Sequence, residues 1–415
     1  MKRIAIIGAS HAGVSCADKL RQYGFKGALI LIDRLPGLPV QRPPLSKKLF
    51  QSDDADFEAF YLRSKEFFTQ ENIELRTDSN VTSIDQKTKT ISLENGDDIT
   101  YDILILAMGA DAKRPDFVSK QASNIHVLRD TQDALKLRKT ALNSDKAVII
   151  GGGFIGLEVA SSMRMAGLVV DLVEFEPRLL ARVSSPQISE FFRLLHNKQG
   201  VSFHLGKAVT DIIYSETGQA RSVKLSSGEI LECDVLVFGI GVAPNINLAK
   251  SLGLCVADGV TVDNTYLASD DIYVIGDLAF SKKRSNIRTE SVYHAQFSAA
   301  VAAASITGSN MPEQEAFWFW SDQYDVKLQI AGVLPKISEA QQIHKEVRSG
   351  KKEGSFSVWS WFQDKLVCIE AIGDPQSYMI GKRLLEQDTD ISPEMIADET
   401  VSLKQLFEKF VANAR

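Results

Sequence analysis

Three glycines at Gly151, Gly153 and Gly156 complete the pattern G-x-G-x-x-G, whose spacing suits a pyrophosphate. They follow an apolar run at residues 147–150 and precede a helix pattern at residues 157–166. Glycine lets the backbone come close to the phosphates, and the helix N-terminus offers free N–H groups and a partial positive charge. This stretch therefore predicts a dinucleotide-binding turn.

A stretch near the start of the chain repeats this arrangement imperfectly, with Gly8, Ser10 and Gly13 at the three positions. Ser10 adds a side chain where the backbone would approach a phosphate most closely. The phosphate contact is therefore expected to be wider or to use the Ser10 hydroxyl. Because the same strand, turn and helix pattern occurs twice, the chain is expected to bind two dinucleotides.

Each glycine turn is followed by a strand pattern that ends on an acid, Asp33 in the first copy and Glu174 in the second. A carboxylate at this place accepts hydrogen bonds from a ribose. Glu174 favours a free 2′-hydroxyl and repels a 2′-phosphate, and Phe175 and Glu176 follow where a phosphate-reading arginine would stand. The second site is therefore predicted to prefer NADH over NADPH.

The elements that position these residues are predicted as two strand–turn–helix–strand units, each closed by an apolar strand that ends in glycine. From residue 312 the pattern changes to aromatic and alternating segments. The predicted fold class is α/β, with two interleaved Rossmann-type dinucleotide-binding domains and a C-terminal α+β domain. The predicted domains are residues 1–113 with 244–311 for one dinucleotide, 114–243 for the other, and 312–415.

The composition is that of a soluble globular protein, with 415 residues of which 44% are hydrophobic and 24% charged. A net charge of −6 gives no support to nucleic-acid binding. No apolar run reaches membrane-spanning length, and the first strand pattern follows MKR directly, so we expect a cytoplasmic protein without a membrane segment. No residue spacing indicates a metal site.

The four cysteines, Cys16, Cys233, Cys255 and Cys368, are scattered along the chain. No two are close enough in sequence for a C-x-x-C pair, and the neighbours of Cys16 indicate a small buried filler. Free thiols are the simplest expectation, and they count against a dithiol reductase mechanism.

Six motifs spread over most of the chain give it a resemblance to a known family. They are RPPLSK at residues 42–47, GGGFIGLE at 151–158, VEFEPRLLARV at 173–183, GVAPN at 241–245, YVIGD at 273–277 and WFWSDQ at 318–323. Together they resemble the FAD-dependent, NADH-using ferredoxin reductases that serve bacterial aromatic-ring dioxygenases and cytochrome P450 systems. RPPLSK followed much later by WSDQ is specific to this group.

The resemblance implies that FAD takes a hydride from NADH and passes single electrons to a [2Fe-2S] ferredoxin feeding an oxygenase. It also implies a Lys47–Glu158 pair that orients the nicotinamide. The residues implied for FAD are Gly8, Ser10, Gly13, Asp33, Arg42, Lys47, Gly109, Gly276, Asp277, Glu290 and Trp320. Those implied for NADH are Gly151, Gly153, Gly156, Glu158, Glu174, Arg182 and Gly241.

Within this set, Arg42 and Lys47 resemble family residues at the isoalloxazine ring. Asp277 resembles the acid that bonds the ribityl or phosphate side, with capping of the next helix as the alternative. Trp320 is expected beside the flavin, toward the protein partner.

The chain departs from the family pattern around the expected flavin pocket. Ser10, Val40, Met108, Val292 and His294 stand where the family commonly has glycine, tyrosine, threonine, tryptophan and asparagine, respectively. These changes bear on the packing and potential of the flavin more than on the type of reaction.

A local basic cluster at Lys282, Lys283, Arg284 and Arg288 is suited to steer an acidic ferredoxin, although an ordinary solvated loop is an equal alternative. The oligomeric state is left open between monomer and homodimer.

Two alternative functions are an NADH oxidase or peroxidase and an NADH-sensing partner-binding flavoprotein resembling apoptosis-inducing factor. The oxidase group carries an early redox cysteine, and this chain has none between Cys16 and Cys233.

Overall fold

The computed structural model describes residues 2–48, 58–118, 122–281, 288–335 and 337–413. The chain divides into two compact units, each assembled from three separate stretches. Unit 1 comprises Met1–Arg42, Asp56–Asp111 and Val242–Gln314. Unit 2 comprises Pro43–Ala55, Ala112–Gly241 and Glu315–Arg415. The RPPLSK motif is therefore divided between the units after its arginine.

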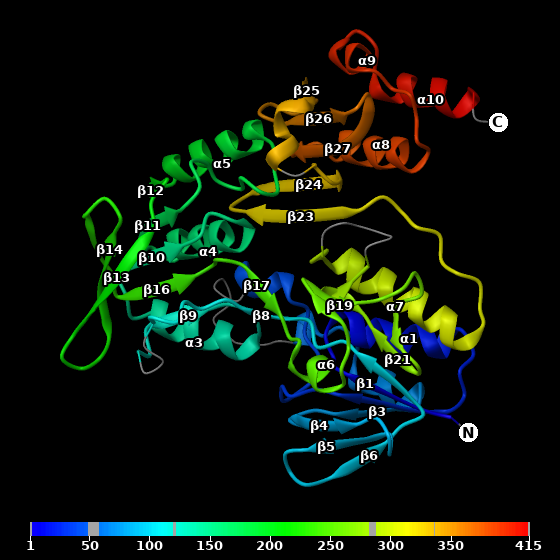
Figure 1. Ribbon diagram of the computed structural model, residues 1–415. Helices are drawn as coiled ribbons and strands as arrows, with labels where there is room; N and C mark the ends of the chain where they lie inside the picture. Colours follow the sequence, from blue (N-terminus) through cyan, green and yellow to red (C-terminus); the bar gives the residue numbers. More distant parts are fainter. Residues whose placement is uncertain (1, 49–57, 119–121, 282–287, 336, 414–415) are drawn as a thin grey trace. The chain divides into compact units, whose positions relative to one another are not determined.

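Unit 1 is built around a six-stranded sheet in the order β20–β21–β7–β1–β2–β3 (Figure 1). The strands from β3 to β21 run parallel, and β20 pairs antiparallel at the edge. Strands β1, β2 and β7 are aliphatic runs buried along nearly their whole length, as expected where both faces of a sheet are covered. The bounds are β1 Arg3–Ile7, β2 Ala28–Ile32, β3 Ile73–Arg76, β7 Ile103–Leu106, β20 Leu267–Ser269 and β21 Ile272–Val274.

Helices α1 (His11–Gln22) and α7 (Val292–Thr307) pack closely against each other in unit 1. Both helices contribute buried alanines to the core of the unit, and such small side chains let two backbones come near. The other helices are α2 Lys65–Gln70, α6 Asn247–Ser251 and the 3₁₀ turns η2 Glu58–Phe60 and η3 Gly276–Leu278. The other strands are β4 Val81–Asp85, β5 Thr90–Leu93, β6 Asp98–Thr100, β17 Val242–Pro244, β18 Val256–Ala257, β19 Gly259–Thr261 and β22 Ala279–Phe280. Strand β8, Ala110–Ala112, lies where the chain passes into unit 2.

Unit 2 contains a five-stranded parallel sheet in the order β12–β11–β10–β16–β9. Its strands are β9 Ile125–Val127, β10 Lys146–Ile150, β11 Val169–Glu174, β12 Val201–Leu205 and β16 Val235–Phe238. Its helices are η1 Pro43–Ser46, α3 Thr131–Ala141, α4 Phe154–Met165 and α5 Pro186–Lys198. A three-stranded antiparallel sheet is formed by β13 Val209–Tyr214, β14 Ala220–Leu225 and β15 Ile230–Glu232.

The last hundred residues of unit 2 form an antiparallel sheet in the order β23–β24–β27–β26–β25, with helices α8, α9 and α10 beyond it (Figure 1). Some of its buried side chains belong to the same hydrophobic core as α4 and α5, namely Leu328, Ile330, Val358, Cys368 and Ile372. Trp359, Trp361 and Ile369 belong to a separate core with residues of α8, α9 and α10. The strands are β23 Trp318–Gln323, β24 Val326–Gly332, β25 Ile343–Ser349, β26 Phe356–Phe362 and β27 Lys365–Ile372. The helices are η4 Ile337–Gln342, α8 Pro375–Glu386, α9 Pro393–Ala397 and α10 Leu403–Asn413. The boundaries of three separate domains stay a prediction.

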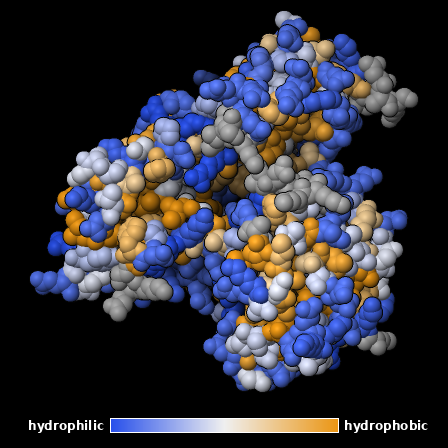
Figure 2. All heavy atoms as spheres, in the orientation of Figure 1, coloured by the Kyte–Doolittle hydropathy of each residue, from blue (hydrophilic) through white to orange (hydrophobic). Residues whose placement is uncertain are grey.

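The surface is mixed in character. On the face drawn in Figure 2, hydrophilic residues are spread widely, with apolar residues gathered in patches between them. Among the described residues, no helix combines the length and the apolar character needed to cross a bilayer.

Candidate functional site

Each unit contains one glycine turn, and the two turns have the same backbone geometry. Gly8 and Gly151 have φ of +106° and +108°, in the region that favours glycine. Each donates its N–H to the end of the neighbouring strand, to Ile32 O at 2.7 Å and to Val173 O at 2.8 Å. The backbone thus turns sharply at the end of β1 and of β10, and the following helix points its N-terminus into the turn.

The third glycine of each turn allows the helix to pack directly on it. A Cβ added at Gly13 would lie 1.8 Å from Gly8 O, and one at Gly156 would lie 1.9 Å from Gly151 O. The middle position differs, because a Cβ at Gly153 would meet no atom within 4 Å. The open space over Gly153 is the room that a phosphate group needs, so this turn fits a dinucleotide.

The acid at the end of the second strand holds each turn in place. Asp33 Oδ2 accepts the N–H of Ala9 at 2.6 Å, and Glu174 Oε2 accepts that of Gly152 at 2.5 Å. Their other oxygens accept the N–H of the residue two positions on, at 2.8 Å and 2.7 Å respectively. Carboxylate oxygens have further lone pairs, so both acids can also accept ribose hydroxyls.

In unit 1 the middle position of the turn is filled by Ser10. Arg42 Nε donates to Ser10 Oγ at 3.3 Å, and the Arg42 backbone N–H donates to His11 Nε2 at 3.3 Å. The structure thus places Arg42 at the glycine turn, where a cation suits a pyrophosphate. The Ser10 hydroxyl and the Arg42 guanidinium together replace the bare backbone of the usual pattern.

Gly276 brings the start of η3 close to α1. Its φ is +68°, a Cβ there would lie 2.8 Å from Ala12 Cβ, and its N–H donates to Ser298 Oγ at 2.9 Å. Asp277 follows on η3 and is partly exposed. Because Ser291 caps α7, Asp277 is not the cap of the next α-helix.

Gly109 and Gly241 stand near the points where the chain passes between the units. Both have positive φ, +66° and +93°. Gly109 O accepts the N–H of Asn245 at 3.0 Å within unit 1, and Gly241 O accepts that of Lys113 at 2.9 Å within unit 2. His294, one of the departures from the family pattern, contacts Tyr266 Oη through Nε2 at 3.1 Å.

The expected basic docking cluster needs one correction. Lys282, Lys283 and Arg284 lie outside the described residues. The Arg288 side chain is only 6% exposed and donates to Asp277 O at 2.8 Å and Glu290 Oε1 at 2.5 Å. Its charge is used inside unit 1, so the inclusion of Arg288 in a docking surface was wrong. Glu290 itself is exposed and is bound to Arg288.

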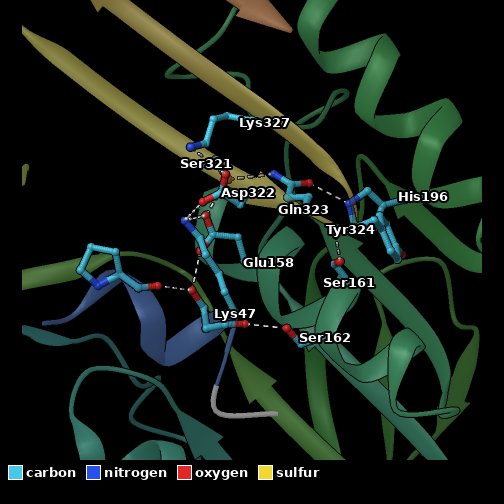
Figure 3. Close-up of polar contacts among 12 residues, drawn as sticks. Lys47, Glu158, Ser161, Ser162, His196, Ser321, Asp322, Gln323, Tyr324 and Lys327 are labelled. Carbon is cyan, nitrogen blue, oxygen red and sulfur yellow. Dashed lines mark hydrogen bonds and ion pairs between the residues drawn. The ribbon is translucent and has the colours of Figure 1, made fainter. Parts of the chain in front are cut away.

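Lys47 and Glu158 form a buried ion pair in unit 2 (Figure 3). Their Nζ and Oε1 atoms are 3.3 Å apart, and their side chains are 11% and 4% exposed. Glu158 lies on α4, and Lys47 follows the short helix η1. Ser162, four residues after Glu158 on the same helix face, donates its hydroxyl to Ser46 O at 2.7 Å and anchors η1 on α4.

Two serine hydroxyls complete the surroundings of the Glu158 carboxylate. Ser321 Oγ donates to Oε1 at 2.5 Å, and Ser46 Oγ donates to Oε2. Burial raises the pKa of Glu158, while Lys47, Ser321 and Ser46 act to lower it. Ser46 is the last residue of η1, and its hydroxyl binds the acid.

Lys47 has two further neighbours on β23. Its Nζ lies 3.5 Å from Asp322 Oδ2 and 5.6 Å from the centre of the Trp320 ring, which is partly exposed. Trp320 is therefore a neighbour of the Lys47–Glu158 ion pair. The Arg182 side chain is 75% exposed and reaches Glu176 Oε1 at 3.5 Å.

All four cysteines are free in the structure, and Cys16, Cys233 and Cys368 are buried. Burial raises the pKa of the Cys16 and Cys233 thiols to about 12. Both stay protonated near neutral pH and are poor nucleophiles. In the part of the chain that the structure describes, no three histidine, cysteine or acidic side chains are grouped to hold a metal ion.

Because unit 2 buries two histidines, we expect the protein to lose stability against unfolding in acid. Burial lowers the pKa of His126 and of His196 from 6.5 to about 4. The unfolded chain then binds more protons than the folded one below about pH 6.5, so the free energy of unfolding falls from there toward pH 4. The loss is about 3 kcal/mol at most for each histidine. Urea unfolding across this range checks it, and a variant with glutamine at both positions should show a flatter profile. Identical slopes would contradict the prediction.

Residues 2–303 match the family model for pyridine nucleotide-disulphide oxidoreductases. The chain belongs to this family. Residues 318–407 match the reductase C-terminal family model. Members of the pyridine nucleotide-disulphide oxidoreductase family use FAD and NAD(H), in agreement with the two glycine turns, and the prediction of these two cofactors is confirmed.

Several individual members resemble the chain along at least 90% of its length. It is 36% identical to rhodocoxin reductase of Rhodococcus erythropolis, over 97% of this chain and 93% of the relative. It is 35% identical to rubredoxin-NAD(+) reductase of Pseudomonas putida, over 90% and 96%. Among solved structures, the ferredoxin reductase for the CYP199A2 system of Rhodopseudomonas palustris matches with a TM-score of 0.92 and 36% identity, over 98% of this chain and all of that chain. A covalent putidaredoxin reductase–putidaredoxin complex also matches with a TM-score of 0.92, at 30% identity.

Proposed function

We propose that this oxidoreductase is an NADH-dependent ferredoxin reductase of the cytoplasm, which supplies single electrons to a small iron–sulphur protein of an oxygenase system. The observation that carries the proposal is the state of its cysteines. The family is named for disulphide chemistry, yet all four cysteines here are free and three are buried. Electrons taken from NADH therefore need an acceptor outside the chain, and the relatives are named for redoxin acceptors.

The turn of unit 1 is assigned to FAD. Gly8 and Gly13 shape the backbone around the pyrophosphate, and Ser10 offers it a hydroxyl. Arg42 was expected at the isoalloxazine ring, but because it donates to Ser10 we assign its cation to the pyrophosphate instead. Asp33 accepts the adenosine ribose hydroxyls, as its position at the end of β2 allows. Asp277 follows Gly276 on η3 and is assigned to the ribityl side. Gly109 and Glu290, which also lie in unit 1, are likewise assigned to the FAD site.

The turn of unit 2 is assigned to NADH. Gly151, Gly153 and Gly156 leave room for the pyrophosphate, and α4 presents its N-terminus to it. Glu174 is already fixed by two backbone N–H groups, so its carboxylate is held ready for the 2′-hydroxyl and meets a 2′-phosphate with like charge.

When bound, the two cofactors supply the hydride transfer and the step from two electrons to one. Lys47 and Glu158 are assigned to orient the nicotinamide. The pair is buried, and the two serine hydroxyls fix the carboxylate, so the Lys47 ammonium is held at a defined place. Trp320, beside Lys47, shields the pair from water. Arg182 and Gly241 stay assigned to the NADH side.

For the partner, we propose docking through Lys282, Lys283 and Arg284, without Arg288. Positive charges on a chain of net charge −6 would speed the encounter with an acidic ferredoxin. A monomer or a homodimer is compatible with this arrangement.

The proposal is tested by anaerobic NADH oxidation with a panel of purified [2Fe-2S] ferredoxins, with oxygen and peroxide as separate acceptors. We expect turnover with at least one ferredoxin and little with oxygen or peroxide. NADPH should be used less efficiently than NADH by at least about tenfold, the equivalent of 1.4 kcal/mol. Fast turnover with peroxide and none with any ferredoxin would overturn the proposal.

A further inference from the structure

A continuous row of polar contacts runs through unit 2 from Tyr324 to Glu158 (Figure 3). Tyr324 Oη lies 3.3 Å from His196 Nδ1, and His196 Nε2 lies 2.8 Å from Gln323 Oε1. Gln323 Nε2 lies 3.2 Å from Ser321 Oγ, which donates to Glu158 Oε1 at 2.5 Å. The row joins α5, β23 and α4, three elements that are far apart in the sequence.

The chemistry of Glu158 fixes the direction of every hydrogen bond in this row. A carboxylate only accepts, so the single Ser321 proton goes to Glu158. The Ser321 oxygen can then only accept from Gln323, and this orients the amide with its NH₂ toward Ser321. The Gln323 oxygen therefore faces His196, and it accepts a proton from Nε2.

The same reasoning gives the direction of the hydrogen bond between His196 and Tyr324. A neutral histidine carries one proton, so protonation of Nε2 leaves Nδ1 as an acceptor. Tyr324 must then donate its hydroxyl proton to Nδ1. All four hydrogen bonds consequently point the same way, toward Glu158.

We propose that Tyr324, His196 and Gln323 are positioning residues: they form a one-directional row of donors that ends on Glu158 and keeps its carboxylate ionised and fixed against Lys47. The inference rests on the proposed function for its relevance to NADH. Hydrogen bonds aligned in one direction polarise one another, so the last donor, Ser321, becomes a stronger donor to the carboxylate.

Burial supports this arrangement. His196 is fully buried and Gln323 is 1% exposed. Burial lowers the pKa of His196 to about 4 and raises that of Tyr324 to about 12, so near neutral pH the imidazole is neutral and the phenol keeps its proton. Each group is therefore in the protonation state that the row requires.

The backbone at Tyr324 is also held. Its φ of +55° is unusual for a bulky residue, and its N–H donates to Ser161 Oγ on α4 at 2.8 Å. Ser161 thus ties the β23–β24 turn to the helix that carries Glu158. The turn that presents Tyr324 to His196 is fixed on the same element as the acid.

The charged groups around the row are few in the described part of unit 2. Lys47 faces Glu158 directly, and Asp322 and Lys327 follow at the Lys47 end. Arg164 acts on Tyr324 at the other end. Of these, only Lys47 is in contact with the carboxylate, so removal of the donor row is not masked by another cation.

The experiment compares wild type with His196→Leu and Gln323→Leu, with His126→Leu as a matched control. His126 is a buried neutral histidine of the same unit that bonds Thr140 Oγ1 at 2.9 Å and is not a member of the row. Difference infrared spectroscopy during a pH titration separates the protonated carboxyl of Glu158 from the carboxylate, and Glu158→Gln assigns the band. Nitrogen-15 NMR of histidine-labelled protein reports the tautomer of His196, which His196→Leu assigns.

We expect the Nε2–H tautomer in the wild type. We expect the titration midpoint of Glu158 to rise by a few tenths of a pH unit in His196→Leu and Gln323→Leu, because Ser321 still donates to the carboxylate and only the strengthening of its bond by the row, about 10–30%, is lost. His126→Leu should leave the midpoint unchanged. An Nδ1–H tautomer, or a midpoint shared by wild type and both row variants, would overturn the proposal. If both row variants fail to fold, the wild-type tautomer alone decides. None of these measurements uses NADH or a ferredoxin, so a failure of the proposed function would leave them intact and be seen separately.

Discussion

Replacing Glu158 with glutamine is expected to slow flavin reduction by NADH about 10- to 100-fold. The change leaves Lys47 without its charged partner in a buried place, a loss of about 1.5–3 kcal/mol for a hydrogen bond to a charged group. Lys47→Met should have an effect of similar size, because it leaves Glu158 buried without a cation. Stopped-flow absorbance of the flavin measures both rates.

The double variant Lys47→Met/Glu158→Gln separates a coupled pair from two independent residues. Its loss should be smaller than the sum of the single losses, because each single change already breaks the 3.3 Å contact. Asp322→Asn is the matched control. It removes the other carboxylate near Lys47, at 3.5 Å, but that side chain is 39% exposed, so its effect should be small. Simple additivity of the two buried changes would mean that they do not act together.

Two alanine substitutions in the same glycine turn are expected to affect different properties, one the stability of unit 2 and the other its affinity for NADH. Gly156→Ala should destabilise unit 2 by about 3 kcal/mol, because its Cβ would lie 1.9 Å from Gly151 O, and neither backbone segment can move away freely. Urea unfolding measures this loss.

Gly153→Ala should change stability by less than about 1 kcal/mol, since its Cβ meets no protein atom and φ there is −80°. It should nevertheless weaken NADH binding by about tenfold or more, a cost of at least about 1.4 kcal/mol, because the methyl group occupies the space assigned to a phosphate. Titration with NADH checks this. Wild-type affinity in Gly153→Ala would show that the phosphate lies elsewhere.

The local features of the fold could be predicted from the sequence because their causes are local. The strand, glycine turn and helix of each copy follow one another directly, and the strand and helix patterns at residues 147–150 and 157–166 correspond to β10 and α4. Helix α4 begins at Phe154 rather than at residue 157, because the turn feeds directly into it. Helix α5 was not predicted, although Ser185 and Pro186 carry the signals of a helix start.

The contacts of Glu158 could be predicted only in part. Its pairing with Lys47 came from motif resemblance. Ser321, although it stands in the WSDQ motif, was not assigned to Glu158, and His196 was missed altogether, because hydrogen bonds between residues 127 and 163 positions apart leave no periodic signal. A weak signal did exist: Glu158, Ser161 and Ser162 are polar residues on a helix whose other buried positions are apolar or glycine. Such polar residues at helical spacing need partners on a neighbouring element.

The distances along the chain between Glu158 and its partners bear on how the protein is made. Ser46 precedes it by 112 positions and Ser321 follows it by 163. At about 5–20 residues per second, Glu158 is synthesised roughly 8–30 seconds before Ser321. Throughout that interval the nascent α4 carries an acid that cannot yet be buried with all its donors. We therefore expect unit 2 to close only after β23 has been synthesised, and a chain ended before residue 318 to be retained by chaperones rather than released as a folded nucleotide-binding fragment.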